Sequence, residues 1–118
     1  MNGQVLMSYY ERKKARIEEN RRRIFERDNW HCQYKNCYSS EIEIAHRVAK
    51  SESNKAEMRM HWLRKYKIEL TYGQLDAIMN HDFNIVSSCS KHNSYFNIGF
   101  NKVEKYKLLD RIYKDLYA

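Results

Sequence analysis

Two pairs of metal-ligand residues, far apart in the sequence, constrain the fold of this chain more than any other feature. Cys32 and Cys37 are separated by four residues, and Cys89 and His92 by two. Four thiol and imidazole ligands in two close pairs are the set that tetrahedral Zn²⁺ requires, and each pair closes a small chelate loop. One zinc held by both pairs would cross-link distant parts of the chain. We therefore predict a structural Cys₃His zinc site that uses every cysteine.

The spacing of the first pair leaves alternatives open, because a gap of four residues is wider than the usual two. Cys32 and Cys37 could instead be buried free thiols, with His92 on the surface, and a disulfide is the third alternative. Three cysteines cannot form a closed set of disulfides, which favours metal binding or burial. A structural zinc would also supply folding free energy, which a core built from 118 residues needs.

The net charge of +7 comes from 22 Lys and Arg against 15 Asp and Glu. The excess lies in three basic stretches, residues 1–28, 47–75 and 102–118, which flank the two nearly neutral segments that hold the metal-ligand pairs. A basic surface attracts polyanions, and nucleic acid is the commonest of these. The alternative is a generically basic protein without such a partner.

The composition predicts one folded domain over residues 1–118, since 42% of the residues are hydrophobic and there are three Gly and no Pro to form linkers. No apolar run approaches the roughly 20 residues of a membrane span. The N-terminus lacks the basic-then-apolar order of a signal peptide. We expect a soluble, cytoplasmic protein without a membrane partner.

Capping boxes and short β-prone runs predict an α+β fold. The boxes open at Ser8, Asn54 and Asn101, each with Glu three residues later. They predict helices over residues 8–28, 54–70 and 101–118, the first with only a thin apolar seam. Residues 41–46 and 83–88 are predicted as two strands.

Three blocks of the sequence resemble successive parts of the HNH endonuclease family. They are RRIFERDNWHC at 22–32, IAHR at 44–47 and HDFNIVSSCSKHN at 81–93, and the resemblance spans roughly residues 21–99. Phage endonuclease VII is similar in placing an Asn directly after its last zinc ligand, as Asn93 stands after His92. The resemblance implies a ββα-metal core over residues 29–99, in which two strands and a helix surround one catalytic cation, with a structural zinc knuckle and flanking α-helices.

Carried over to this sequence, the resemblance makes His46 the general base that activates water for phosphodiester hydrolysis. A His that is neutral near pH 7 suits that task. Asn84 takes the middle motif position and is expected to orient the His46 side chain through the strand pair. Asn93 takes the third position as a ligand of a catalytic Mg²⁺ or Mn²⁺, for which an amide oxygen is suitable. Each of these residues taken singly is more often structural, and their joint placement with the zinc pairs favours a catalytic site.

One residue departs from the family pattern. Family members usually have Asp or His immediately before the base, where it binds the cation, and this chain has Ala45. Glu43 is the first candidate replacement, because strand residues at i and i+2 share a face. The alternatives are a ligand from elsewhere in the chain, a defective site, and a Glu43 that is simply a solvent-facing strand residue.

The predicted DNA contacts are basic side chains outside the catalytic motif. The segment 47–80 is an insertion longer than a minimal HNH unit needs, and its polar face is expected to lie along the backbone of double-stranded DNA. A solvated helix face is an equally good interpretation of these charges. The candidate phosphate contacts are Arg21, Arg22, Arg23, Arg47, Lys50, Arg64 and Lys65.

The sequence therefore predicts a metal-dependent DNA endonuclease of the restriction, homing or phage type. Cutting both strands together would require a homodimer, with the first or the last helix as the candidate interface. The main alternative is a non-catalytic, zinc-stabilised nucleic-acid-binding module in which Ala45 marks a lost active site, and a further one is an interaction domain without a nucleic-acid partner. An oxygen-rich cation site near His46 would distinguish the enzyme from both.

Overall fold

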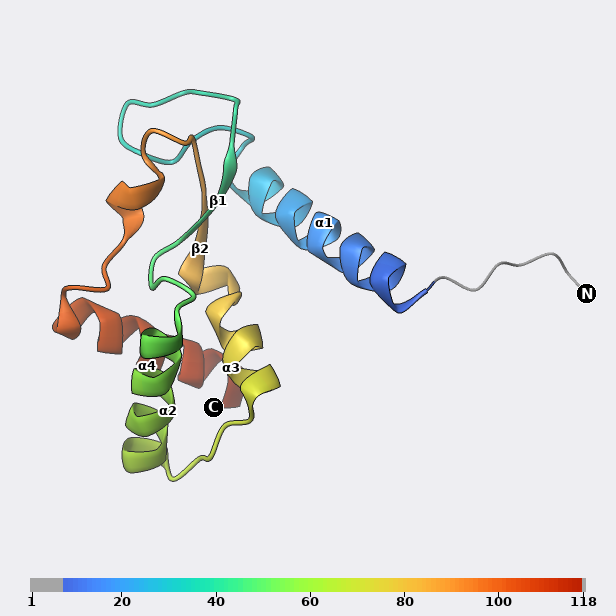
Figure 1. Ribbon diagram of the computed structural model, residues 1–118. Helices are drawn as coiled ribbons and strands as arrows, with labels where there is room; N and C mark the ends of the chain where they lie inside the picture. Colours follow the sequence, from blue (N-terminus) through green and yellow to red (C-terminus); the bar gives the residue numbers. More distant parts are fainter. Residues whose placement is uncertain (1–7, 118) are drawn as a thin grey trace, which may run out of the picture.

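Two short antiparallel strands lie between the long N-terminal helix and three further helices (Figure 1). The computed structural model describes residues 8–117. Within them the chain is a small α+β domain whose helices are α1 (Tyr9–Arg27), α2 (Glu52–Tyr66), α3 (Tyr72–Met79) and α4 (Lys102–Tyr117). The strands are β1 (Glu43–His46) and β2 (Ile85–Ser88), and two 3₁₀ turns are η1 (Asp82–Asn84) and η2 (Asn93–Phe96). The predicted α+β class is confirmed.

The two faces of the strand pair are covered by different elements. In the register Glu43 is opposite Ser88 and His46 is opposite Ile85. Side chains alternate along a strand, so Glu43 and Ala45 share one face and His46 points to the other. The Ser87 hydroxyl reaches the Ile24 carbonyl of α1 at 3.5 Å, which places α1 on the His46 face. The turn η2 packs against β1 from the opposite side (Figure 1).

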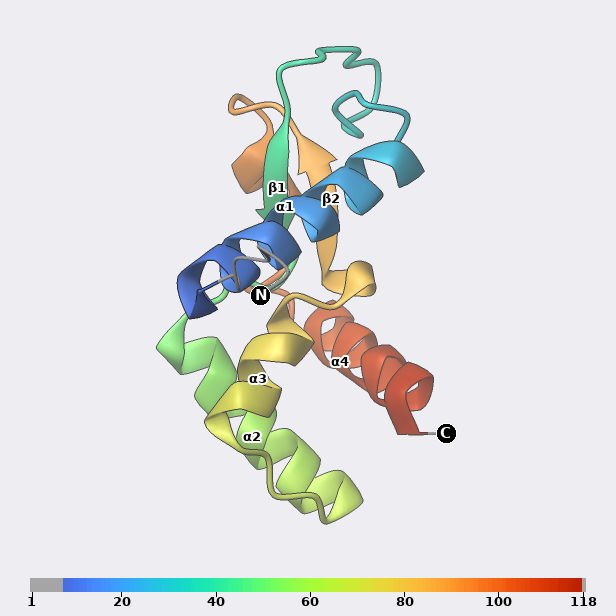
Figure 2. The same cartoon turned by 90° about the vertical axis from the view of Figure 1, so that its right-hand side faces the viewer.

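The largest hydrophobic core lies below the sheet, where α2, α3 and α4 pack together (Figure 2). Trp62 of α2 is fully buried at its centre. Tyr66 of α2 stacks on Tyr113 of α4 with ring centroids 3.6 Å apart, so the tyrosine face of the last helix is used within the chain. The buried members of this core are Val48, Met58, Trp62, Leu70, Leu75, Ile78, Met79, Leu109 and Ile112.

The helix starts at Ser8 and Asn101 are confirmed, and the predicted start at Asn54 is wrong. Both hydrogen bonds of the Ser8 capping box are present, and the Asn101 side chain accepts from the Glu104 amide at 3.1 Å. The cap of α2 is instead Ser51, whose hydroxyl accepts from the Asn54 amide at 3.2 Å. The basic stretch 1–28 and the predicted helix 101–118 include residues 1–7 and 118, which lie outside the described residues.

The insertion contains two helices where one was predicted. Helix α2 ends at Tyr66, before the predicted end at residue 70, because Lys67 adopts the left-handed conformation with φ of 58° and closes the helix. A second capping box, Thr71 with Gln74, then starts α3. The strands are also shorter than predicted: β1 begins at residue 43 rather than 41, and the first residues of the predicted run 83–88 belong to η1.

The last turn of α1 is fixed to β2, while the rest of the helix projects from the body of the domain (Figure 1). Ile24 is the one residue of α1 that is buried. The Arg27 guanidinium donates to the Asp82 and Ile85 carbonyls, each at 2.8 Å, and to both carboxylate oxygens of Asp28. Asp28 in turn accepts from the Ser87 amide at 2.9 Å. No helix within residues 8–117 is long and apolar enough to cross a membrane.

Asp28 is a buried carboxylate, 7% exposed, whose charged form is stabilised. Burial by itself would raise its pKa, but the hydrogen bonds from Arg27 and from the Ser87 amide outweigh that effect, and the net result is a lowered pKa. A carboxyl whose pKa is lower in the folded than in the unfolded protein stabilises the fold above its unfolded pKa. That stabilisation is lost as the pH falls through the folded value.

We predict that Asp28→Asn lowers the free energy of unfolding by about 1–3 kcal/mol at about pH 7, since the hydrogen bonds to a charged group are lost. The difference from wild type should be smaller at about pH 3, because that pH lies below the ordinary Asp pKa of the unfolded chain, and it should vanish once the pH has fallen through the lowered pKa of folded Asp28. Urea denaturation at both pH values measures this, with Glu19→Gln on the exposed part of α1 as the control. An equal difference at both pH values would contradict the assignment.

Candidate metal centre and active site

The four predicted zinc ligands converge at the end of the strand pair that is remote from the helical core. Their ligand atoms all lie within 4.8 Å of one another. Nδ1 of His92 lies 3.3 Å from the Cys89 sulfur and 3.7 Å from the Cys32 sulfur, and the sulfurs of Cys37 and Cys89 are 3.9 Å apart. A tetrahedral zinc with ordinary bond lengths separates two sulfurs by about 3.8 Å and a sulfur from a nitrogen by about 3.5 Å. The cluster therefore fits a zinc ion and is a candidate Cys₃His metal site.

The disulfide alternative is wrong, because all three cysteines are free and 3.9 Å between the Cys37 and Cys89 sulfurs is far longer than a disulfide bond of about 2.05 Å. The alternative in which His92 lies on the surface, away from the cysteines, is also wrong. Its ring packs in a stack on Tyr34, with the centroids 4.2 Å apart.

Local backbone structure brings each ligand to the cluster. Asn36 has a φ of 63°, a left-handed conformation that Asn tolerates, and this lets the Cys37 amide donate back to the Tyr34 carbonyl at 2.9 Å. The Gln33 amide donates to the Ser87 carbonyl at 3.0 Å and so ties this loop to β2. We call residues 32–37 and 89–92 together the zinc knuckle.

The thiols of the cluster differ in acidity. Burial would raise the pKa of Cys32, but hydrogen bonds from the Cys89 and Tyr34 backbone and from His92 lower it to about 6. A backbone hydrogen bond from Ser39 lowers the pKa of Cys37, but burial and the neighbouring thiols Cys32 and Cys89 together raise it more. Cys32 is thus prepared as a thiolate near neutral pH, which is the form that binds a metal.

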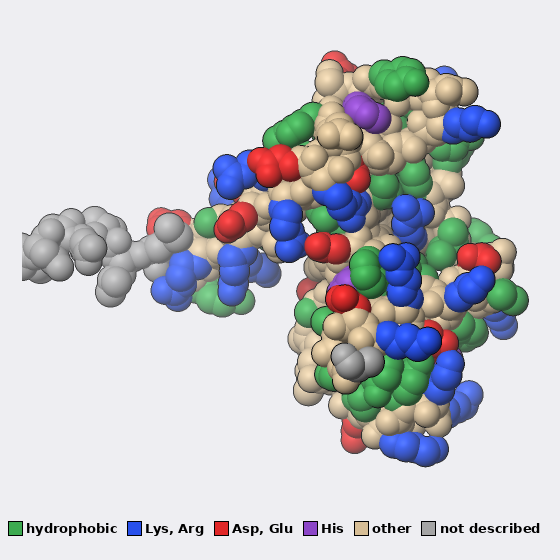
Figure 3. Space-filling view, turned by 180° about the vertical axis from the view of Figure 1, so that it is seen from behind, with side chains coloured by type: hydrophobic (Ala, Val, Ile, Leu, Met, Phe, Trp, Pro, Cys, Tyr) green, Lys and Arg blue, Asp and Glu red, His purple; other side chains and the backbone are tan. Residues whose placement is uncertain are grey.

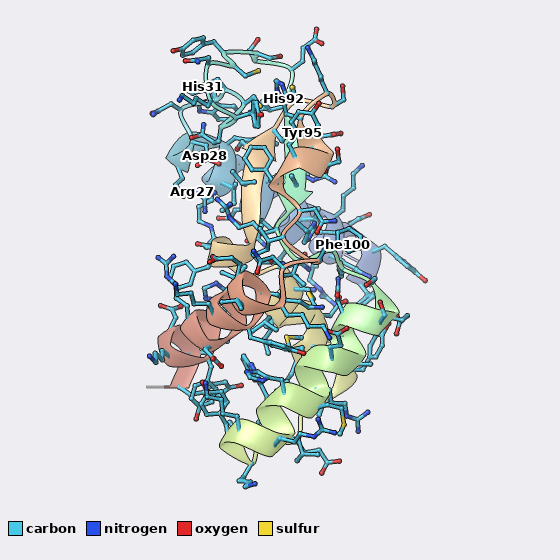
Figure 4. The ribbon with its side chains drawn as sticks, turned by 90° about the vertical axis from the view of Figure 1, so that its left-hand side faces the viewer. Arg27, Asp28, His31, His92, Tyr95 and Phe100 are labelled. Atoms are coloured by element: carbon cyan, nitrogen blue, oxygen red, sulfur yellow. The ribbon has the colours of Figure 1, made fainter. Side chains whose placement is uncertain are left out.

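Aromatic side chains around the knuckle were not predicted from the sequence. Tyr95 packs beside His92 with ring centroids 5.4 Å apart, and the two lie close together in Figure 4. Tyr34 contacts both rings. His31, at the same end of the molecule in Figure 4, points its Nδ1 at the Cys32 carbonyl at 2.9 Å and is not one of the ligands.

The predicted base, His46, ends β1 and is held by a residue that the sequence analysis missed. Its Nε2 lies 3.0 Å from Oδ1 of Asn80, the residue that ends α3. An amide oxygen only accepts hydrogen bonds, so Nε2 carries the proton in this contact. In a neutral ring Nδ1 then has the free lone pair. Only the missed helix α3 brings Asn80 to this position.

Asn84 acts on the backbone beside His46 rather than on its ring. Its side chain is 1% exposed, and its oxygen accepts from the Val48 amide at 2.8 Å. Its nitrogen donates to the Val48 carbonyl at 3.1 Å and to the Met79 carbonyl at 2.7 Å. The expectation that Asn84 orients the His46 side chain is therefore corrected: Asn84 fixes the course of the chain after β1 and joins it to the end of α3.

Glu43 and Asn93, the two predicted cation ligands, are brought together across the η2 face of the sheet. Nδ2 of Asn93 donates to a carboxylate oxygen of Glu43 at 3.0 Å. Ala45, between them and the end of β1, is fully buried and offers no ligand. His46 lies about 10 Å further along the strand from Glu43 and on the other face.

Four of the predicted DNA contacts are paired with carboxylates of the chain itself. Arg23 lies 2.7 Å from Asp82, Lys50 lies 3.2 Å from Asp76, and Lys65 lies 2.6 Å from Asp110. Arg22 lies 3.9 Å from Glu26. Arg21 and Arg64 remain as exposed candidates for phosphate contacts. Arg47 is half-buried and lines a groove together with residues of α4 and β2.

Comparison with known proteins identifies no relative: no protein family, no curated protein and no solved structure matches the chain. The interpretation of the site therefore depends on its own geometry.

We predict that the purified protein holds about one zinc per chain and that Cys89→Ser removes it, because the loss of one of four ligands opens the site. Elemental analysis of dialysed protein measures the metal content. Ser90→Ala, at the exposed neighbouring position, is the control and should retain zinc. A fully folded, zinc-free protein after chelation would contradict the assignment.

We also predict that Asn84→Ala lowers the free energy of unfolding by about 2–4 kcal/mol, because it leaves buried backbone groups at Val48 and Met79 without partners. Urea denaturation measures the change, and Asn20→Ala on exposed α1 should alter stability by less than about 0.5 kcal/mol. Equal stability of the two variants would show that these hydrogen bonds do not support the site.

Proposed function

We propose that this protein is a metal-dependent DNA endonuclease of the HNH type, with His46 as the general base. The observation that carries the proposal is the contact between His46 Nε2 and Asn80 Oδ1 at 3.0 Å. With Nε2 donating to the Asn80 oxygen, Nδ1 has the lone pair that would accept a proton. A base needs both a defined direction and a free lone pair, and both are supplied here at the end of a strand.

In the proposed reaction, Nδ1 of His46 takes a proton from a water molecule as the water oxygen attacks the phosphorus of a DNA phosphodiester. The bond between phosphorus and the 3′ oxygen breaks, leaving a 5′-phosphate and a 3′ oxyanion, which takes a proton from solvent to become the 3′-hydroxyl, and His46 later releases its proton to solvent. Asn80 keeps the ring in position while it is protonated, since its amide oxygen continues to accept from Nε2. A bound Mg²⁺ or Mn²⁺ would stabilise the charge on the phosphate and on the leaving oxygen.

The donor set of Glu43 and Asn93 suits a hard cation, which would act on the phosphate attacked at His46 only if the substrate spans both faces at the end of β1. A carboxylate and an amide oxygen are suitable ligands for Mg²⁺, which commonly binds through one or two protein oxygens and completes its shell with water and phosphate. The amide of Asn93 now donates its nitrogen to Glu43. It would turn over to present its oxygen, a change that costs little because the two ends of an amide have the same shape.

A non-catalytic, zinc-stabilised nucleic-acid-binding module is the second candidate. The observation that favours it is the fully buried Ala45, at the position where a cation ligand would otherwise stand beside the base. Such a module would bind DNA and depend on the Cys₃His cluster for its fold. Binding alone would not require the His46–Asn80 contact or the Glu43–Asn93 pair.

We predict that the wild-type protein nicks supercoiled plasmid in the presence of Mg²⁺ or Mn²⁺. His46→Ala should reduce the rate by about 10²–10⁴-fold, which is the usual contribution of a general base. Glu43→Gln should raise the concentration of metal needed for half-maximal cleavage, because the carboxylate no longer attracts the cation. Agarose gels of plasmid incubated over a metal titration measure both effects.

The matched control is Ser94→Ala, at the exposed position after Asn93, which should cut like wild type. Zinc content and thermal midpoint of every variant show whether the fold is intact. A wild type that binds DNA and never cuts it under either metal would favour the non-catalytic module. Equal cutting by His46→Ala would remove His46 from the mechanism.

A further inference from the structure

Helix α4 carries a basic stripe that the sequence analysis did not assign to any function. Lys107, Arg111 and Lys114 are spaced at i, i+4 and i+7, so they lie on one side of the helix. All three are exposed, and none forms an ion pair with any residue between 8 and 117. At a rise of about 1.5 Å per residue the stripe is about 10 Å long.

The stripe forms one wall of an open groove with a volume of about 1200 Å³. The opposite walls are the end of α1, strand β2 and the segment around η2, with Arg27 and Arg47 among the lining residues. Figure 3, which views the molecule from behind, shows Lys and Arg side chains on both α1 and the body below it. Arg27 and Asp28 mark the α1 side in Figure 4.

The carboxylates that line the groove are mostly bound by the protein itself. Asp28 is held by Arg27 and the Ser87 amide, and Asp82 pairs with Arg23. Asp110 is turned towards α2, where it accepts hydrogen bonds from His61, Lys65 and Tyr66. Glu104 is the one lining carboxylate without such a partner in the described residues, against four unpaired cations, Arg47, Lys107, Arg111 and Lys114.

Arg47 is the most constrained of these cations. It is half-buried, and its guanidinium makes no hydrogen bond to the described part of the chain, although it lies 6.0 Å from the centre of the Phe96 ring. Burial lowers the pKa of Arg47, the nearby charges of Arg27 and Arg111 lower it further, and the charge of Asp28 partly offsets them. Arg111 is itself placed over the Phe83 ring at 4.1 Å. Each of these guanidinium groups thus lies near an aromatic ring and forms no ion pair within the described residues.

We infer that this groove holds the phosphate backbone of a DNA duplex, with Arg47 on one wall and Lys107, Arg111 and Lys114 on the other. Unpaired, pre-positioned Arg and Lys side chains are the groups that contact phosphates in protein–DNA complexes. The inference rests on the proposed function for the identity of the polyanion. The groove adjoins the end of β1, since Arg47 directly follows His46, and so it would anchor the duplex beside the proposed base without taking part in the reaction.

The test is duplex binding in the absence of Mg²⁺ and Mn²⁺, measured by fluorescence anisotropy of a labelled duplex over a series of salt concentrations. The groove variant is Lys107→Gln/Arg111→Gln/Lys114→Gln. The matched control, Lys13→Gln/Lys14→Gln/Arg16→Gln, removes two Lys and one Arg from the projecting part of α1, at exposed positions that do not line the groove and form no ion pair within the described residues.

We expect the groove variant to raise the Kd for the duplex by about tenfold or more. Because each neutralised phosphate contributes about 0.9 to the slope of log K against log salt, the slope should fall by about 2–3. The control should change the Kd by less than about threefold and keep the slope. Arg47→Gln alone should weaken binding and lower the slope by up to about 1.

An equal loss in the groove variant and its control would overturn the inference, because it would show a general charge effect. Unchanged binding by the groove variant would overturn it as well. If the triple variant melts early, Lys107→Gln/Lys114→Gln keeps the Arg111–Phe83 contact and gives the same comparison with an expected slope change of about 2. If the protein binds DNA through the groove and never cuts it, the nuclease proposal is contradicted and the groove inference is supported. The two proposals can therefore fail separately.

Discussion

The convergence of two distant ligand pairs is the constraint on which the rest of the site depends. Cys32 and Cys37 precede β1, and Cys89 and His92 follow β2, so the cluster closes the end of a sheet of only two strands. Two short strands are marginal without additional packing. The large hydrophobic core lies among α2, α3 and α4, at the other end of the sheet. A metal at the cluster would therefore supply stability where the apolar core does not reach.

Two sets of hydrogen bonds link the strand pair to the helices that surround the residues proposed for catalysis. Arg27 and Asp28 fix the end of α1 to β2 through backbone groups of β2 and η1. Asn84 fixes the chain that follows β1 to the end of α3, and the same end of α3 carries Asn80 to the His46 ring. Each connection includes buried or half-buried hydrogen bonds, those of Asp28 to Ser87 and of Asn84 to Val48 and Met79, which are costly to leave unmade and so hold one geometry.

The arrangement separates the proposed tasks in space. Glu43 and Asn93 meet on the η2 face of β1, whereas His46 lies at the strand end, and Arg47 enters the groove beside α4. Charge is separated in the same way, because many surface carboxylates are paired with basic residues of the chain, while the stripe on α4 has no such partners among the described residues. The stripe on α4 therefore keeps charge that no carboxylate of the described residues neutralises.

The sequence by itself determined the ligand set, the α+β class and the helices that open at Ser8 and Asn101, because ligand spacing and helix caps are local properties that residue types report directly. The sequence did not show that Lys67 is left-handed and ends α2, since tertiary packing decides where a helix stops. Because the helix was expected to continue to residue 70, the capping box that starts α3 at Thr71 was missed. The partners of Asn84, the Asn80 contact to His46 and the pairing of Arg23 with Asp82 all join residues far apart in the sequence. Only the tertiary structure decided them, because hydrogen bonds between distant residues depend on how the helices pack and leave no periodic signal in the chain.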